Sequence, residues 1–126
     1  MPKRLTDRER VLRAIKETGT GGWQQTVLDA AHSYGFKVMQ IRRSAYMGKD
    51  QRPKSVVQAD GKGWPDLFCI RPKDGRMVAV ECKRVDGEAT PEQRQWLEWL
   101  AACGVRCWLL KPGDDVQFEA IFGEAR

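Results

Sequence analysis

The stretch Met77–Lys83 reads MVAVECK and alternates as a β-strand does. Successive side chains in a strand point to opposite faces, and residues two apart lie about 7 Å from each other on one face. Glu81 and Lys83 therefore share a face. The other face carries the apolar side chains Val78, Val80 and Cys82. Because a buried carboxylate and a buried ammonium are costly unless they are paired or bind a cation, this strand is predicted to carry a functional site.

Asp66 is the residue that the surrounding chain brings toward Glu81. It precedes an apolar strand at 67–70, and the turn at 72–75 then leads into the strand that carries Glu81. Two carboxylates with Lys83 beside them form a hard-oxygen cation site suited to phosphodiester hydrolysis, in which a metal polarises a phosphoryl oxygen and activates a water. The plain alternative is an exposed charge pair and an ordinary turn.

Hydrophobic periodicity and cap residues predict the remaining elements. The clearest is a helix in which Thr90 is the N-cap, Pro91 is the first helical residue and Gln93 completes a capping box. Other helices are expected at 6–18, 23–34 and 114–122, and other strands at 36–41 and 105–110. The order α-α-β-β-β-α-β-α contains a strand–helix–strand crossover and predicts an α/β fold with a mixed central sheet flanked by helices.

One domain is expected over residues 1–126, with 1–19 as an N-terminal helical extension. A hydrophobic fraction of 41% excludes a disordered chain. No apolar stretch reaches the ~20 residues of a membrane span, and the polar start Met1–Arg8 has no signal-peptide core, so we expect a cytoplasmic protein with no membrane partner. The four cysteines form no Cys-x2-Cys pair and His32 is the single histidine, which argues against a zinc site.

The net charge of +5 favours polyanionic partners, which bind through phosphate contacts and counterion release. Much of this charge lies in the segment Arg42–Lys62, where Gly, Pro and Ser interrupt any periodic pattern. We interpret it as a long basic loop, and long loops in compact domains are often functional. An equally weighted alternative is a solvated flexible segment. If the segment is a functional loop, its candidate phosphate contacts are Arg42, Arg43, Lys49, Arg52, Lys54 and Lys62.

These residues resemble a known pattern. Asp66 after a proline, followed by Glu81-Cys82-Lys83, is similar to the PD-(D/E)xK nuclease superfamily. Four segments are similar to its VRR-NUC family: Gly61–Leu67 (GKGWPDL), Glu81–Arg84 (ECKR), Thr90–Gln93 with the following Trp96-Leu97, and the helix-to-strand turn at Gly104-Val105. The resemblance extends over roughly residues 23 to 110, which is nearly the whole domain.

The resemblance implies a restriction-endonuclease-like fold and a dependence on Mg²⁺ or Mn²⁺. It implies Asp66 and Glu81 as metal ligands, with the backbone carbonyl of Cys82 as a third. Lys83 becomes the catalytic lysine. Gln93 supports the site from the helix that faces the sheet, and this role is compatible with its capping role. No nucleotide cofactor is expected, because the chain has no phosphate-binding G-x4-G-K-[ST] loop.

Gln24 matches a glutamine on an early helix of the family. Family members commonly carry a glutamate about one turn before it, near Thr20 in this sequence. Neither Thr20 nor Gly21 supplies a carboxylate, so the number of metal ions, one or two, stays open. Glu17 is a nearby carboxylate that could compensate.

Similar stand-alone proteins are mostly phage-encoded, and the resemblance implies a homodimer that cuts branched DNA such as Holliday junctions in a bacterial host. Two symmetric cuts need two copies of a domain with one site. The best candidates for DNA contact near the cut are Arg43 and Lys62, and Arg84 is another.

Alternatives on the same site are a nickase, a flap nuclease or a single-strand nuclease, in which Tyr46 and Trp64 stack on unpaired bases. Trp96 and Trp99 are interpreted as core residues. A catalytically inactive DNA-binding module is a third hypothesis, and the intact charged trio of the candidate site argues against it.

Overall fold

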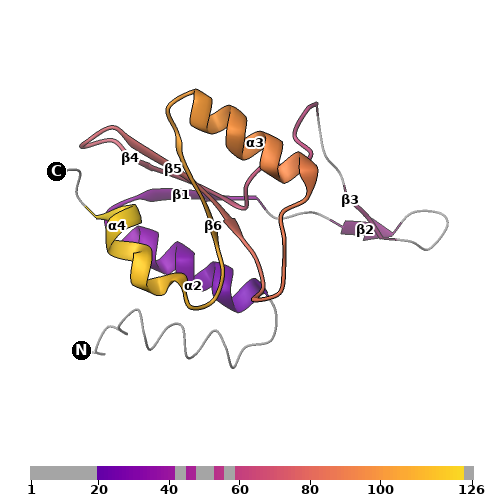
Figure 1. Cartoon of the computed structure of the whole chain (residues 1–126), viewed down its shortest axis with the longest axis horizontal. Coiled ribbons are helices and arrows are strands. Elements are labelled where there is room, and N and C mark those ends of the chain that lie inside the picture. Colours follow the sequence, from indigo (N-terminus) through magenta and orange to yellow (C-terminus); the bar gives the residue numbers. More distant parts are fainter. Residues whose placement is uncertain (1–19, 42–44, 48–52, 56–58, 124–126) are drawn as a thin grey trace.

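The computed structural model describes residues 20–41, 45–47, 53–55 and 59–123. β4 (Leu67–Arg71) pairs antiparallel with β1 (Lys37–Gln40) and with β5 (Arg76–Cys82), whereas β6 (Arg106–Leu110) runs parallel to β5. The order across the sheet is β1-β4-β5-β6 (Figure 1). A parallel neighbour needs a crossover connection, and α3 (Pro91–Ala102) provides it. The predicted mixed α/β sheet is therefore confirmed.

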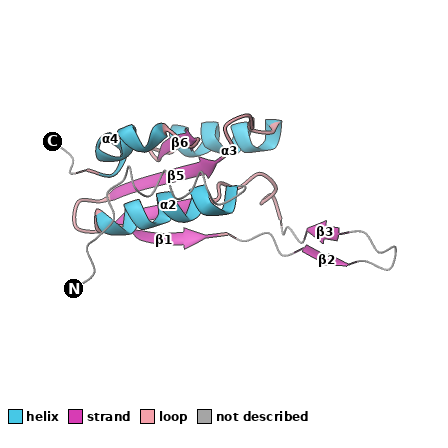
Figure 2. Ribbon diagram, turned by 90° about the horizontal axis from the view of Figure 1, so that it is seen from below, coloured by secondary structure: helices cyan, strands magenta, loops and turns pink. Residues whose placement is uncertain are grey.

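Helices cover both faces of this sheet. α2 (Thr20–Ser33) and α4 (Phe118–Phe122) lie on one face and α3 lies on the other (Figure 2). The last expected helix differs in detail, because the 3₁₀ turn η1 (Asp114–Gln117) leads into the short α4. None of the helices in the described ranges combines the length and the apolar character that a membrane span requires.

The hydrophobic core lies between the sheet and the α2–α4 pair. Trp23 of α2 stacks on Phe118 of α4 with 5.8 Å between ring centroids. The sheet contributes the side chains that point to this face, namely Leu67, Cys69, Val78, Val80 and Cys82. Removing this apolar surface from water is the main driving force for folding. The expected apolar face of β5 is thus confirmed, and it leaves Glu81 on the opposite face, which α3 covers.

The segment Arg42–Lys62 is not the plain loop that its composition predicts. It contains a hairpin in which β2 (Ala45–Met47) and β3 (Pro53–Ser55) pair antiparallel as a small separate sheet. Strands of three residues are too short to show a two-residue period, so hydrophobic patterning could not reveal them. The expected helix at 6–18 and the candidate contacts Arg42, Arg43, Lys49 and Arg52 lie outside the described residues.

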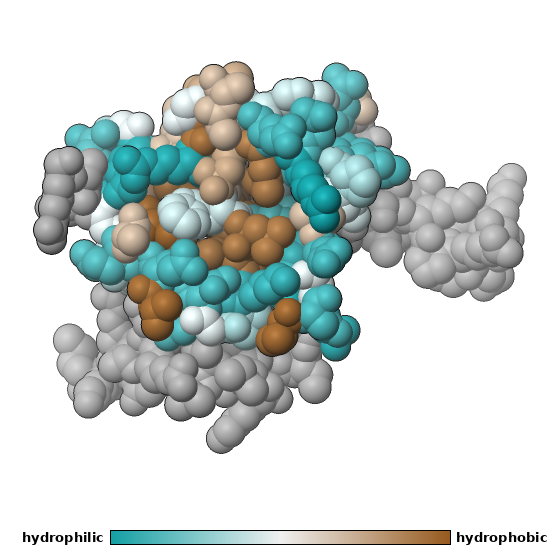
Figure 3. Space-filling model, in the orientation of Figure 1, coloured by the Kyte–Doolittle hydropathy of each residue, from teal (hydrophilic) through white to brown (hydrophobic). Residues whose placement is uncertain are grey.

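β6 is an edge strand of the central sheet. Its middle residues Cys107, Trp108 and Leu109 are half-buried. Figure 3, in the orientation of Figure 1, shows apolar side chains gathered in the middle of this face, where β6 runs, with hydrophilic side chains around them. An edge strand presents unpaired backbone groups to which another chain can add.

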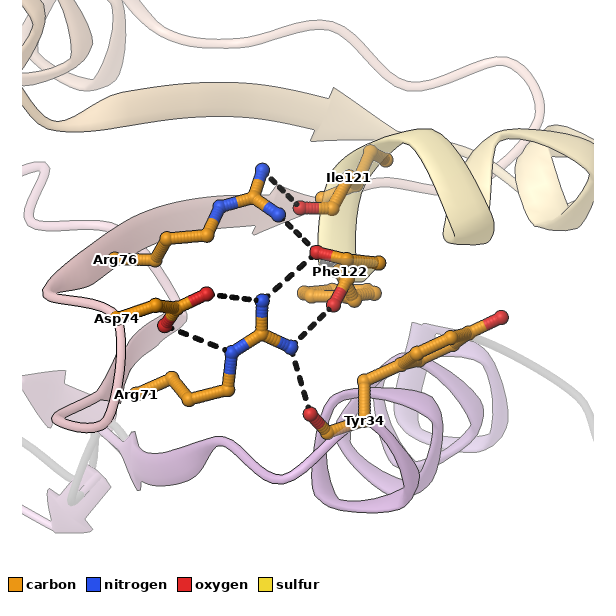
Figure 4. Close-up of polar contacts among 7 residues, drawn as sticks. Tyr34, Arg71, Asp74, Arg76, Ile121 and Phe122 are labelled. Carbon is orange, nitrogen blue, oxygen red and sulfur yellow. Dashed lines mark hydrogen bonds and ion pairs between the residues drawn. The ribbon is translucent and has the colours of Figure 1, made fainter. Parts of the chain in front are cut away.

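A buried arginine joins the ends of several elements (Figure 4). The Arg71 guanidinium donates to both carboxylate oxygens of Asp74 at 2.9 and 2.7 Å. It also donates to the carbonyl oxygens of Tyr34, Phe122 and Gly123, each at 2.8 Å. Carbonyls near helix C-termini carry partial negative charge, so a guanidinium stabilises them. This network holds the ends of α2 and α4 against the turn between β4 and β5.

Asp74→Asn is expected to lower the melting temperature at neutral pH and to matter less in acid. The hydrogen bond from Arg71 lowers the pKa of Asp74 below its usual value of 3.8. A depressed folded pKa stabilises the fold above the unfolded pKa, and this contribution is lost as the pH falls through the folded pKa. Thermal unfolding between about pH 7 and about pH 2 should show the two curves converging in acid. The exposed Asp86→Asn serves as control, and a constant gap at all pH values would contradict the assignment.

Candidate active site

The hairpin of β4 and β5 brings Asp66 to the end of the strand that carries Glu81. Leu67 pairs with Val80, so the residue before β4 lies next to the last residues of β5. Asp66 Oδ2 accepts a hydrogen bond from the backbone N–H of Cys82 at 2.9 Å. This contact fixes the Asp66 carboxylate against β5.

The Glu81 carboxylate is enclosed, since the residue is only 1% exposed. Its Oε1 accepts a hydrogen bond from Gln93 Nε2 at 2.9 Å and lies 3.4 Å from Lys83 Nζ. Its Oε2 is buried without a hydrogen-bond partner among the described residues. Burial, and then the charge of Asp66, raises the pKa of Glu81 to about 8, while Lys83 opposes the rise. A cation placed between the carboxylates would stabilise this arrangement.

Gln93 uses both ends of its amide. Its Oε1 accepts the backbone N–H of Thr90 at 2.9 Å, and its own backbone N–H donates to Thr90 Oγ1 at 3.2 Å. This is the predicted capping box, and it leaves Nε2 for Glu81. The capping role and the supporting role of Gln93 therefore operate together, because the first orients the side chain for the second.

The glycine-rich segment before Asp66 passes closely over the start of α3. Gly63 has φ +89°, and a Cβ added to it would lie 2.6 Å from the carbonyl carbon of Glu92. Only glycine fits this approach without displacing backbone. In the same segment Lys62 Nζ lies 3.4 Å from a Glu92 carboxylate oxygen. The motif thus packs the segment that leads to Asp66 against the helix that presents Gln93.

The start of α2 lies at the same end of the sheet as the site. Trp23 Nε1 donates to the carbonyl oxygen of Leu110 at 3.0 Å, and Leu110 is the β6 partner of Cys82. The neighbouring Gln24 is half-buried. The first turn of α2, which begins at Thr20, carries no acidic residue.

The candidate DNA contacts that the structure describes lie in separate segments of the chain. The Lys62 side chain is 76% exposed, and Arg84 is exposed directly after Lys83. Trp64 is half-buried, with 5.8 Å between its ring centroid and that of Phe68. Lys54 lies in β3. Of these cations, Arg84 and Lys62 are exposed on the segments that also carry Lys83 and Asp66.

The interpretation of Trp96 and Trp99 as core residues is wrong. Trp99 is 51% exposed and Trp96 is half-buried. The one fully buried residue of α3 is Gln93. α3 packs mainly on β5 and β6, and its two tryptophans lie to the side of this contact, where Trp96 packs on Trp64 and Trp99 is open to solvent. Tryptophans at helical spacing are typical of a core face, and the sequence carries no signal that separates the two cases.

The donors at this site fit a hard divalent cation. Mg²⁺ is commonly held by one or two carboxylates, with water and substrate phosphate completing its shell. Asp66 and Glu81 supply two carboxylates, and Glu81 Oε2 lacks a donor. The Cys82 side chain belongs to the core, which leaves its backbone for the site. Within the described ranges no three His, Cys, Asp or Glu side chains converge, so further ligands would be backbone oxygens and water.

Comparison with known proteins finds similarity to one family. The family model of the VRR-NUC domain matches residues 24–111. A solved structure described as a VRR_NUC domain has 20% identity and a TM-score of 0.49, covering 92% of this chain and 96% of that chain. A second, described as a VRR_NUC domain protein, has 22% identity and a TM-score of 0.42, covering 77% and 88%. A search among curated proteins finds no match. Since the matched residues span most of the chain and include the whole site from Asp66 to Gln93, this protein belongs to the VRR-NUC family of nuclease domains.

Proposed function

We propose that this chain is a Mg²⁺- or Mn²⁺-dependent DNA endonuclease whose active site is Asp66, Glu81 and Lys83. The observation that carries the proposal is the buried Glu81 carboxylate, which has one oxygen without a donor and a second carboxylate beside it. A protein keeps such a costly arrangement where a cation or a reaction requires it. Asp66, Glu81 and the backbone carbonyl of Cys82 would hold the ion.

A divalent ion held by these residues would supply Lewis-acid chemistry, which polarises a phosphoryl oxygen and lowers the pKa of a bound water. The residues of the chain prepare the site for it. The Cys82 N–H and the Gln93 amide orient the two carboxylates. Lys83 Nζ, 3.4 Å from Glu81, can donate hydrogen bonds that position the attacking water and a phosphate oxygen.

We further propose branched DNA, such as a four-way junction, as substrate and a homodimer as the active form. Two symmetric cuts require two sites, and the described part of this chain carries one candidate site. The edge strand β6 is half-buried and runs through the apolar middle of its face, so it is a surface that a second copy could cover (Figure 3). The basic segment Arg42–Lys62 and Arg84 would contact phosphates beside the cut.

Cleavage of a substrate panel tests these proposals. The protein is incubated with a four-way junction, a flap, a duplex and a single strand, each with Mg²⁺, Mn²⁺ or EDTA. We expect paired symmetric nicks in the junction with either metal and none in EDTA. Asp66→Ala, purified in parallel, should be inactive, and equal cutting by this variant would reveal a contaminant. No cleavage of any substrate would overturn the nuclease assignment and leave a DNA-binding module.

A preference for the flap or the single strand would support the second candidate function. The observation that favours it is the exposure of Trp99 on α3, the helix that also carries Gln93, since unpaired bases stack on exposed aromatic rings.

A further inference from the structure

A hollow of about 700 Å³ lies on the flank of α3, and its lining residues are Asp60, Lys62, Glu92, Gln95, Trp96 and Trp99. This volume lies within the range of roughly 300–1,000 Å³ that is usual for small-molecule sites. Two segments build it, the chain before Asp66 and the first turns of α3. Trp96 Nε1 donates to the Asp60 carbonyl oxygen at 3.0 Å, and this bond ties the two segments together.

The aromatic side of the hollow has the shape of a corner. The Trp96 and Trp99 rings meet at 87° with 5.2 Å between their centroids. Trp64 also packs against Trp96, with 5.0 Å between the ring centroids and 70° between the ring planes. Trp99 is 51% exposed, so much of its indole surface is open to solvent. A planar ring stacked on Trp99 would therefore meet the Trp96 indole nearly at a right angle.

The charges at the hollow favour a nucleobase over a phosphate. Asp60 and Glu92 are acidic, and Lys62, the single cation among the lining residues, lies 3.4 Å from Glu92. A phosphate would meet net negative charge here. Adenine, cytosine and guanine each carry an exocyclic amino group that can donate a hydrogen bond to a carboxylate, whereas thymine has no exocyclic amino group.

The hollow adjoins the candidate active site through both of its segments. Glu92 lines the hollow, and the next residue, Gln93, donates to Glu81. Lys62 lines it from the segment that runs through Gly63 to Asp66. The hollow and the candidate active site are therefore built from the same two segments of the chain, the one that leads to Asp66 and the first turns of α3.

We propose that this hollow receives one unpaired, amino-bearing nucleobase of the DNA strand close to the cut. The base stacks on Trp99, and its amino group donates to the Asp60 or Glu92 carboxylate. The inference rests on the proposed nuclease function and adds a substrate feature to it, namely an unpaired nucleotide beside the scissile phosphate. It gives the enzyme a means to favour DNA that is open at this position over paired duplex.

Equilibrium binding of single strands in EDTA tests the proposal without turnover. The probes are fluorescent oligonucleotides of deoxyadenosine, deoxycytidine or deoxythymidine and a fully paired duplex. We expect the first two to bind more tightly than the third. Trp99→Ala should weaken single-strand binding about tenfold and leave duplex binding unchanged, because stacking on one ring is lost. Trp99→Phe, which keeps a ring, should retain most of the affinity.

Asp60→Asn is the matched variant for the amino contact. It should reduce the preference for deoxyadenosine and deoxycytidine over deoxythymidine, since an amide accepts hydrogen bonds less strongly than a carboxylate. The exposed Val116→Ala controls for a change remote from the hollow. The proposal would be overturned if the unmodified protein bound all three strands equally and Trp99→Ala bound them with the same affinity as the unmodified protein. A change in oligomeric state of Trp99→Ala with unchanged DNA binding would also overturn it, because the hollow would then be a protein contact.

The same proteins assayed for cleavage with Mn²⁺ separate the two proposals. Cleavage by the unmodified protein, together with unaltered single-strand binding by Trp99→Ala, overturns the base site and leaves the nuclease assignment intact. Base-selective binding without cleavage of any substrate supports the base site and overturns the nuclease assignment.

Discussion

Glu81→Gln is expected to lower DNA cleavage by at least about 100-fold and, in the same protein, to raise stability at alkaline pH. Loss of an outer partner of a metal ligand alone typically costs 10–100-fold, so loss of the ligand charge costs more. The amide can still accept the hydrogen bond that Gln93 Nε2 donates to Glu81 Oε1. The loss of activity should therefore come from charge and not from unfolding.

The stability effect follows from the sign of the pKa shift. The pKa of Glu81 is raised from 4.5 to about 8 in the folded protein, chiefly by burial. The folded state then binds more protons than the unfolded state between these values, so stability falls as the pH rises through this window. At about pH 9 the metal-free protein carries the full penalty of a buried carboxylate, which Gln removes; the gain should be on the order of 1–3 kcal/mol.

Urea unfolding in EDTA at about pH 5 and about pH 9 measures this effect. The two proteins should have similar stability at the lower pH and differ at the higher one. At neutral pH, with Mn²⁺ in place of EDTA, the unmodified protein should be stabilised, because a ligand that binds only the folded state shifts unfolding, and Glu81→Gln should not be. Glu98→Gln, an exposed change on α3, is the control. A Glu81→Gln protein that is less stable at both pH values would refute the account that the ionised Glu81 carboxylate destabilises the metal-free fold.

The elements that could be predicted are those whose signals are local. The alternation in Met77–Lys83 and the capping box at Thr90–Gln93 each specify a conformation within a few residues, and the structure has β5 and α3 there. The hairpin of β2 and β3 has no such signal, because three residues on each side do not establish a period. Its pairing depends on the chain around it.

The features of the candidate site also fall into those that local sequence signals predict and those that they do not. The proximity of Asp66 to β5 follows from a short hairpin, whose geometry is set by the turn between two strands. The exposure of Trp99 does not follow, because it depends on how much of the sheet α3 covers. Helical spacing shows which residues share a face of a helix but not what lies opposite that face. The orphaned oxygen of Glu81 was likewise beyond the sequence, since it depends on which donors reach the carboxylate.

Gly63→Ala is expected to destabilise the protein by about 2–4 kcal/mol and to lower cleavage by about 100-fold. The left-handed backbone alone costs about 1 kcal/mol for a residue with a side chain, and forcing a methyl group into packed backbone adds about 1–3 kcal/mol. The added Cβ would lie 2.6 Å from the Glu92 carbonyl carbon and 2.8 Å from the Gln93 backbone nitrogen. The start of α3 must then move, and a 1 Å displacement of a positioning group such as Gln93 can cost about 100-fold in rate.

Gly75→Ala separates the two causes. Gly75 has φ +69°, and a Cβ added to it meets nothing within 4 Å. It carries the backbone penalty without the clash, so it should lose about 1 kcal/mol and keep its cleavage activity. Urea unfolding and cleavage with Mn²⁺ are measured for both variants. Equal losses of stability would mean that φ alone explains Gly63, and full activity of Gly63→Ala would mean that the contact with α3 does not position Gln93. Gly63→Ala is expected to lose more stability and more activity than Gly75→Ala, because the backbone of α3 leaves no room for a side chain at position 63. This one close contact then both packs the fold and aligns Gln93 with Glu81.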